Sequence, residues 1–87
     1  MQINLIVIRT DKPKELSNFY EQIGMKFEYH QHGKGTWHYS AEIEKTVFEI
    51  YPLIKNQESS DKSLRLGFTI ENLDETIANL KKQNVDF

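Results

Sequence analysis

The chain has 87 residues, a formal net charge of −2 and no cysteine. A chain of this length forms one small domain that buries only about 60% of the surface its unfolded form exposes, so we expect marginal stability without a partner. Interspersed charges give no basic stripe for nucleic acid and no polybasic arm for a membrane, and the lack of cysteine excludes disulfides, thiolate metal sites and a catalytic thiol.

The first predicted element is a largely buried strand, Ile3 to Arg9, rich in β-branched residues. It begins almost at Met1, with no signal-like segment before it. The chain also has no span of about 20 apolar residues. We therefore expect a soluble cytoplasmic protein.

A helix is predicted next. Thr10 or Asp11 can cap it, and Pro13 falls in the first turn, where a missing N–H does little harm. One apolar stripe follows at helical spacing: Leu16, Phe19, Tyr20 and Ile23. Gly24 is suited to the left-handed position that ends a helix.

Three strands should follow this helix. Met25 to His32 and Thr36 to Glu42 are joined by a turn whose glycines permit a tight hairpin. A second hairpin around residues 43–44 leads into Thr46 to Leu53, which Pro52 ends or places at an edge. Glu49 lies at the centre of this last strand, opposite in direction to Phe48 and Ile50. A half-buried carboxylate there needs a charged or hydrogen-bonding partner.

The remaining residues are predicted to form a loop, a strand and a helix. Residues 54–62 are polar and aperiodic, Leu64 to Ile70 alternates like a strand, and Asn72 with Glu75 resembles a capping box. Leu73, Ile77 and Leu80 give the helix its apolar stripe.

The order of elements recurs along the chain. At an offset of 60 residues, Ile6 falls on Leu66, Ile8 on Phe68, Glu15 on Glu75, Gly24 on Asn84, Met25 on Val85 and Phe27 on Phe87. We expect an α+β fold in a single domain, 1–87. Its parts are a complete β-α-β-β-β module over 1–53, a linker over 54–62, and the start (β-α) of a second module over 63–87.

Several short stretches carry a family resemblance: Asn4 to Arg9, Phe19 to Glu21, Gly24 to Phe27, Phe48 to Pro52, Leu66 to Phe68 and Asn72 to Glu75. Through them the chain resembles the vicinal-oxygen-chelate superfamily, which includes glyoxalase I, bleomycin-resistance proteins, fosfomycin-resistance enzymes and extradiol dioxygenases. The resemblance implies paired βαβββ modules around a concave cleft, often with modules exchanged between subunits. It also implies that Glu49 matches the metal carboxylate of the first module.

The other metal positions of that family are not retained. The resemblance places Leu5 and Arg65 where metal-binding relatives have histidine, and neither side chain can ligate a metal. The fourth ligand would come from a strand that this sequence does not contain. The family's usual metal site is therefore predicted to be absent, and with it the usual metal-dependent glyoxalase, dioxygenase and epimerase activities.

Arg65 is the partner we expect for Glu49. A charge-assisted pair would satisfy the carboxylate and fill the position of the lost metal. Such a pair can be purely structural. Alternatively, Arg65 and Arg9 present cations to an anionic ligand in the cleft.

The histidines form a second candidate site. If the glycine turn pairs His32 with Thr36, then His30 lies opposite His38, and if Glu42 pairs with Lys45, His38 lies opposite Glu49. His30, His38 and Glu49 would then supply the two-histidine, one-carboxylate set typical of iron or zinc. The simpler interpretation is that the histidines face solvent at the rim of the cleft, because a slip of one residue sends a side chain to the other face.

Aromatic residues divide between the two faces. Trp37 and Tyr39 are predicted to pack in the core with Phe48 and Ile50, whereas Tyr51 shares the face of Glu49 and could stack on a planar ligand.

The leading functional prediction is a metal-free, bleomycin-resistance-like protein that binds a small molecule in a homodimer cleft, with no cofactor. Arg65, Arg9, Tyr51, Glu49 and His38 are the candidate ligand-binding residues. One alternative is a metal-dependent lyase or isomerase, or a dioxygenase, in which Glu49 acts as general base near a metal held by His30 or His38. Another is a degenerate module with only an interaction role.

Overall fold

The computed structural model describes residues 1–61 and 63–82. Its elements follow the order strand, helix, three strands and helix: β1 (Leu5–Thr10), α1 (Pro13–Gln22), β2 (Phe27–His30), β3 (His38–Ile43), β4 (Thr46–Pro52) and α2 (Leu73–Lys82). The predicted α+β class is thus confirmed, and among the described residues each predicted helix and strand is present except the strand over 64–70.

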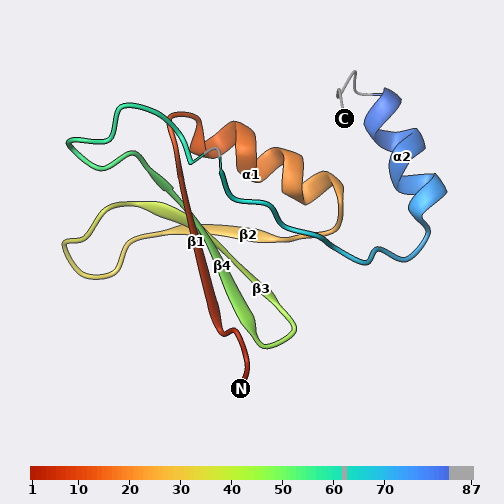
Figure 1. Cartoon of the computed structure of the whole chain (residues 1–87), viewed down its shortest axis with the longest axis horizontal. Coiled ribbons are helices and arrows are strands. Elements are labelled where there is room, and N and C mark those ends of the chain that lie inside the picture. The colour runs from red at the N-terminus through yellow and green to blue at the C-terminus, as the bar shows by residue number, and fades with distance from the viewer. Residues whose placement is uncertain (62, 83–87) are drawn as a thin grey trace.

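The strands form one mixed sheet with the order β1-β4-β3-β2. β2, β3 and β4 are a meander of antiparallel neighbours, and β1 pairs in parallel with β4, with Val7 opposite Glu49. Figure 1 shows α1 lying across one face of this sheet, whereas α2 lies apart from the sheet, beyond the end of α1. The other face of the sheet has no helix over it in the described residues.

The core lies between the sheet and α1. Phe48 and Ile50 of β4 are fully buried, with Ile8 of β1 beside them. Leu16 and Tyr20 of α1 pack against this cluster, and the rings of Tyr20 and Phe48 meet edge to face at 5.0 Å. Because side chains alternate along a strand, burying Phe48 and Ile50 against the helix turns Glu49 toward the opposite, open face.

The start of α1 differs from the prediction. Lys12 occupies the N-cap, and no side chain caps the helix. Thr10 instead accepts a hydrogen bond from the backbone N–H of Lys12 (3.2 Å) and contacts the Ser60 hydroxyl (3.1 Å), because its side chain is turned toward the loop that follows β4. At the other end Gly24 has a φ of 115°, in the region that favours glycine, as expected for the residue that ends the helix.

The two hairpins differ in how well the sequence predicted them. His30 lies opposite His38, as predicted. The predicted pairing of Glu42 with Lys45 is wrong by two residues: Ile43 pairs with Thr46, and Ser40 rather than His38 lies opposite Glu49. The physical reason is a two-residue turn at residues 44–45, in which Glu44 adopts a φ of 53°. A shift of two residues keeps every side chain on its predicted face.

Trp37 is not a core residue. Its side chain is 48% exposed, and its ring stacks on Tyr29 at 5.2 Å. β3 begins one residue later, so Trp37 lies in the β2–β3 loop, outside the ladder that holds Tyr39 against the core.

The segment after β4 covers the end of β1 but forms no further strand among the described residues 63–72. The backbone N–H of Arg9 donates to the Asp61 carboxylate (2.8 Å), and the Asp61 N–H donates to the Arg9 carbonyl (2.9 Å). The strand expected over 64–70 is wrong for this structure, because an extended segment becomes a strand only by pairing with a neighbour. The strand start expected at Val85 to Phe87 lies outside the described residues, and the division into 1–53, 54–62 and 63–87 stays a prediction.

In the part of the chain that the structure describes, no helix has the length and apolar character needed to cross a membrane.

Candidate metal centre

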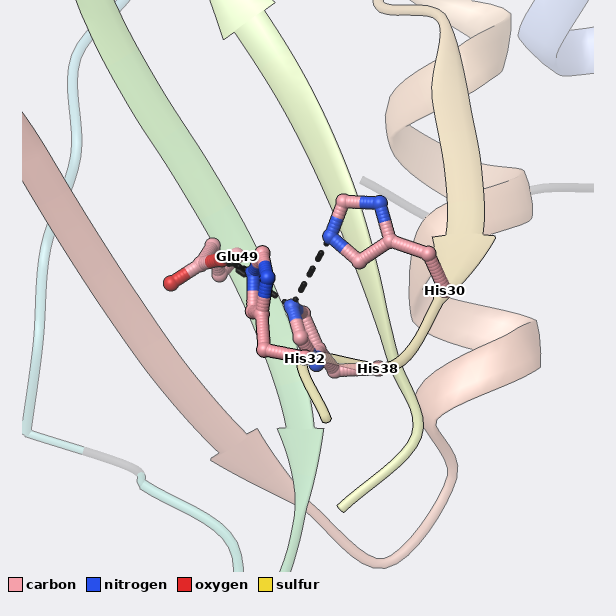
Figure 2. A group of neighbouring side chains, drawn as sticks. All are labelled: His30, His32, His38 and Glu49. Carbon is pink, nitrogen blue, oxygen red and sulfur yellow. Dashed lines mark hydrogen bonds and ion pairs between the residues drawn. The ribbon is translucent and has the colours of Figure 1, made fainter. Parts of the chain in front are cut away.

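The open face of the sheet brings three histidines and one glutamate together. His30 ends β2, His38 begins β3, Glu49 lies at the centre of β4, and His32 follows β2 in the loop. Figure 2 shows these side chains converging in front of the sheet. One ligand atom from each residue can be chosen so that all lie within 4.8 Å of one another.

His38 is at the centre of this cluster. Its Nε2 atom lies 3.1 Å from Oε2 of Glu49 and 3.1 Å from Nε2 of His30, the contacts drawn as dashed lines in Figure 2. The side chain of His38 is fully buried, and that of Glu49 is 13% exposed. The expectation of solvent-facing histidines is therefore wrong for His38, because the diagonal neighbour Glu49 and the ring of Tyr51 cover it.

The backbone determines which nitrogen of His38 carries a proton. Nδ1 lies 2.9 Å from the Thr36 carbonyl oxygen, which can only accept, so Nδ1 is the donor. In the neutral ring Nε2 then has a free lone pair, and this lone pair faces the Glu49 carboxylate and the His30 ring. Two acceptors at 3.1 Å repel one another unless a cation stands between them. That cation is a metal ion or a proton held by His38 or by Glu49, and the His30 ring, 3.1 Å away, can also donate an N–H to Nε2 of His38.

The spacing of the cluster fits a metal ion. Zn²⁺ holds histidine nitrogen and carboxylate oxygen at about 2.0–2.2 Å, which places neighbouring ligands of a tetrahedral site about 3.3 Å apart. The separations that His38 makes with His30 and Glu49 are 3.1 Å, and His32 lies 4.0 Å from Glu49. The bond from His38 Nδ1 to a backbone carbonyl is the outer interaction that orients metal-ligating histidines.

Tyr51 and Arg9 extend the cluster along the open face. The Tyr51 ring stacks on His38 with centroids 4.1 Å apart and planes inclined by 9°, and its hydroxyl lies 3.4 Å from His38 Nε2. The Arg9 guanidinium lies 5.0 Å from the centre of the Tyr51 ring. Burial raises the pKa of Tyr51, and the charge of Glu49 adds to this while Arg9 opposes it. Tyr51 and Glu49 are two residues apart in β4 and lie on the same face of the sheet, as the sequence predicts.

Arg65 does not meet Glu49. It is exposed in the segment without regular structure, and the ion-pair partners of Glu49 among the described residues are His32 and His38. The predicted pair is wrong because the strand that was to position Arg65 is not formed. The role of Arg65 in ligand binding stays a prediction.

Sequence reasoning missed His32 as a member of the cluster. The signal was its spacing: His30 and His32 are two residues apart, so an extended chain places them on one face.

Comparison with known proteins identifies the fold but not a function. No protein-family model matches the chain, and no match was found among curated proteins. An integron cassette protein from the mobile metagenome of V. cholerae is 20% identical with a TM-score of 0.63, over 99% of this chain and 70% of that one. A protein from the mobile metagenome of V. pseudocholerae is 20% identical with a TM-score of 0.65, over 99% and 69% of the two chains. At this identity the likeness supports the α+β fold alone.

Proposed function

We propose that this protein binds a divalent transition-metal ion, with Zn²⁺ as the best fit, through His30, His32, His38 and Glu49. The observation that carries the proposal is the orientation of His38. Its Nδ1 proton is committed to the Thr36 carbonyl, so its Nε2 lone pair is directed at the other ligand atoms. Of the alternatives that the sequence left open, this geometry favours the metal-binding one.

The ligand set defines the class of metal. Imidazole nitrogen suits zinc, copper, iron and nickel, whereas magnesium and calcium prefer sites made only of oxygen. One ligand atom from each of the four residues lies within 4.8 Å of the others, and four ligands are the number that one tetrahedral Zn²⁺ takes.

We also propose that the chain is a module of the glyoxalase and bleomycin-resistance type. The order strand, helix and three strands supports this, as does an open sheet face opposite the helix. In this proposal the metal lies on the concave face, where a small molecule would reach it. The ligands differ from the set that the resemblance implies, since Leu5 and Arg65 contribute nothing and the histidines come from β2, the loop after it and β3. A lyase or isomerase with Glu49 near the ion is the enzymatic form of this proposal.

Metal analysis tests the proposal directly. Protein purified without a histidine tag and dialysed against Zn²⁺ should retain one equivalent, measured by atomic emission, and calorimetry should give one site. The variant Glu49→Gln removes the anionic ligand and should weaken binding by more than about 100-fold, beyond the loss typical of an outer residue. Glu42→Gln is the matched control. Glu42 belongs to β3, and its exposed carboxylate lies on the same face of the sheet as Glu49.

The opposing outcome is equally clear. If no equivalent of zinc, iron, copper or nickel is retained, the cation between His38 and Glu49 is a proton, and the cluster is an ion pair.

A second candidate function is metal-free binding of a small molecule, the function that the sequence suggested, but in a cavity whose lining includes none of the predicted residues Arg65, Arg9, Tyr51, Glu49 and His38. The observation in its favour is a cavity of about 380 Å³ between the end of α1, the β3–β4 turn and the segment around Phe68. This volume is within the range of about 300–1,000 Å³ common for ligand pockets. A thermal-shift screen in EDTA tests it: stabilisation by a compound that Phe68→Ala abolishes supports it, and no stabilisation by any compound opposes it.

A further inference from the structure

The four ligands of the proposed metal centre are not equivalent. His38 is fully buried, and Glu49 is 13% exposed, whereas the side chain of His32 is 71% exposed. His32 is also the more distant neighbour of Glu49, at 4.0 Å compared with 3.1 Å for His38. Three ligands are therefore held by strands of the sheet, and the fourth lies in a loop with most of its side chain exposed to solvent.

The backbone explains this difference. Pairing between β2 and β3 ends at His30 and His38, so His32 lies outside the ladder. The loop is held by its own contacts: the Gly35 N–H donates to the His32 carbonyl (2.9 Å), and the Gln31 amide donates to the Gly35 carbonyl (2.7 Å). Gly33 has a φ of 57°. The position of His32 thus depends on a glycine turn rather than on the sheet.

We propose that His32 is an exchangeable ligand, and that a small monodentate donor from solvent takes its coordination position. The inference rests on the proposed function. His30, His38 and Glu49 keep the ion in place, while His32 swings out with its loop. A metal held by three protein ligands with one replaceable position is the arrangement of catalytic rather than structural zinc sites. His32 would then control access of external ligands to the metal.

The surroundings of the position favour an anionic donor. The Tyr51 hydroxyl lies 3.4 Å from Nε2 of His38, next to the point where the ligand atoms converge, and it can donate a hydrogen bond. Arg9 lies against the same ring and adds positive charge on this side. Azide is a suitable probe, because it is a small anion that binds through one atom.

Cobalt substitution tests the inference. The visible absorption of bound Co²⁺ reports its coordination number, and azide titration reports the replaceable position. In His32→Ala we expect stoichiometric Co²⁺ binding weakened by no more than about tenfold, a changed visible spectrum, and azide binding tighter by severalfold. In Glu49→Gln we expect loss of Co²⁺ binding by more than about 100-fold, as for an essential ligand. Circular dichroism confirms that both variants are folded.

Three outcomes would overturn the inference. If His32→Ala loses Co²⁺ as severely as Glu49→Gln, His32 is a structural ligand. If His32→Ala changes neither the spectrum nor the azide affinity, His32 does not bind the metal, although the site itself stands. If the unmodified protein does not bind Co²⁺ or Zn²⁺, the proposed function fails, and this inference fails with it.

Discussion

Nε2 of His38 lies 3.1 Å from Oε2 of Glu49, although the residue directly opposite Glu49 across the two strands is Ser40. The contact is therefore diagonal, between residues two positions out of register. Diagonal neighbours on one face of a sheet are within reach of long side chains, and here the contact is made by a ring and a carboxylate. His30 lies directly opposite His38 on the neighbouring strand β2, so its ring also reaches Nε2 of His38.

Zn²⁺ should stabilise the folded protein, because an ion that binds only the native state raises its free energy of unfolding. At a free concentration of 100 times the dissociation constant the gain is about 2.7 kcal/mol. We expect a higher melting temperature with Zn²⁺ and no such shift in Glu49→Gln. An identical shift in both proteins would contradict the site.

Gly35→Ala should weaken metal binding severalfold. A Cβ at Gly35 would lie 3.0 Å from the His32 carbonyl oxygen, so the backbone of the turn that positions His32 must shift by a few tenths of an ångström. A competition titration with a zinc-chelating dye measures the change. Gly67→Ala is the control, since a Cβ there meets nothing within 4 Å. Equal affinities in the two variants would show that the turn does not set the position of His32.

Phe48→Ala should destabilise the fold by about 3–5 kcal/mol, the usual cost of removing a buried aromatic ring. Phe48 is fully buried, and both Tyr20 and Phe27 contact its ring edge to face. Urea denaturation measures the loss, and Phe48→Leu offers a milder change of about 1 kcal/mol if the alanine variant does not fold. Ile54→Ala, at a residue 53% exposed in another loop, should change stability by less than about 0.5 kcal/mol. A small effect at Phe48 would contradict the assignment of the core.

Tyr20 should make the protein sensitive to alkaline pH. Burial raises the pKa of Tyr20 above its ordinary value of 10.0, so the folded state holds the phenol proton more tightly than the unfolded chain. This contribution to stability is fully present below the unfolded pKa, and it is lost as the pH rises through the folded pKa. Unfolding scans at rising pH should show a shallower loss in Tyr20→Phe, which keeps the ring. Parallel curves for the two proteins would be the contrary result.

We predict a homodimer, as the sequence suggested. Leu64, Phe68 and Leu73 are 48%, 39% and 54% exposed, which leaves apolar surface along the segment that precedes and enters α2. Light scattering at micromolar concentration should give twice the chain mass. Leu73→Glu should shift the equilibrium toward monomer, whereas Ile54→Glu, at a similarly exposed residue of another loop, should not. A sharp monomer peak for the unmodified protein would refute the prediction.

The sequence predicted the faces of the sheet better than its registers. Alternation alone places Glu49 opposite in direction to Phe48 and Ile50, and the glycine turn correctly pairs His30 with His38. The next register was missed because Glu44, at a φ of 53°, is neither glycine nor asparagine, the residues that usually mark such a turn. Because the register was wrong by two residues and not by one, His30, His38 and Glu49 still lie on one face of the sheet, as the metal-binding alternative requires.

The sequence named the observed partner of Glu49, His38, only through the metal-binding alternative, and the pair with Arg65 is not formed. Arg65 was chosen because a family position suggested it, yet that choice required a strand over 64–70, and pairing between distant segments leaves no local signal. The burial of His38 is likewise a tertiary effect, since it depends on the Tyr51 ring stacked 4.1 Å from it.

The parallel pairing of β1 with β4 has a consequence for how the protein folds. β1 reaches its partner only after the chain has closed a loop from Leu5 to Val47, whereas β2, β3 and β4 pair with sequence neighbours. Contacts between distant residues cost loop entropy and form late. All four proposed metal ligands lie within the meander, between His30 and Glu49. An ion bound there would tie the meander together before the first strand docks, and would therefore raise the rate of folding and not only the stability of the product.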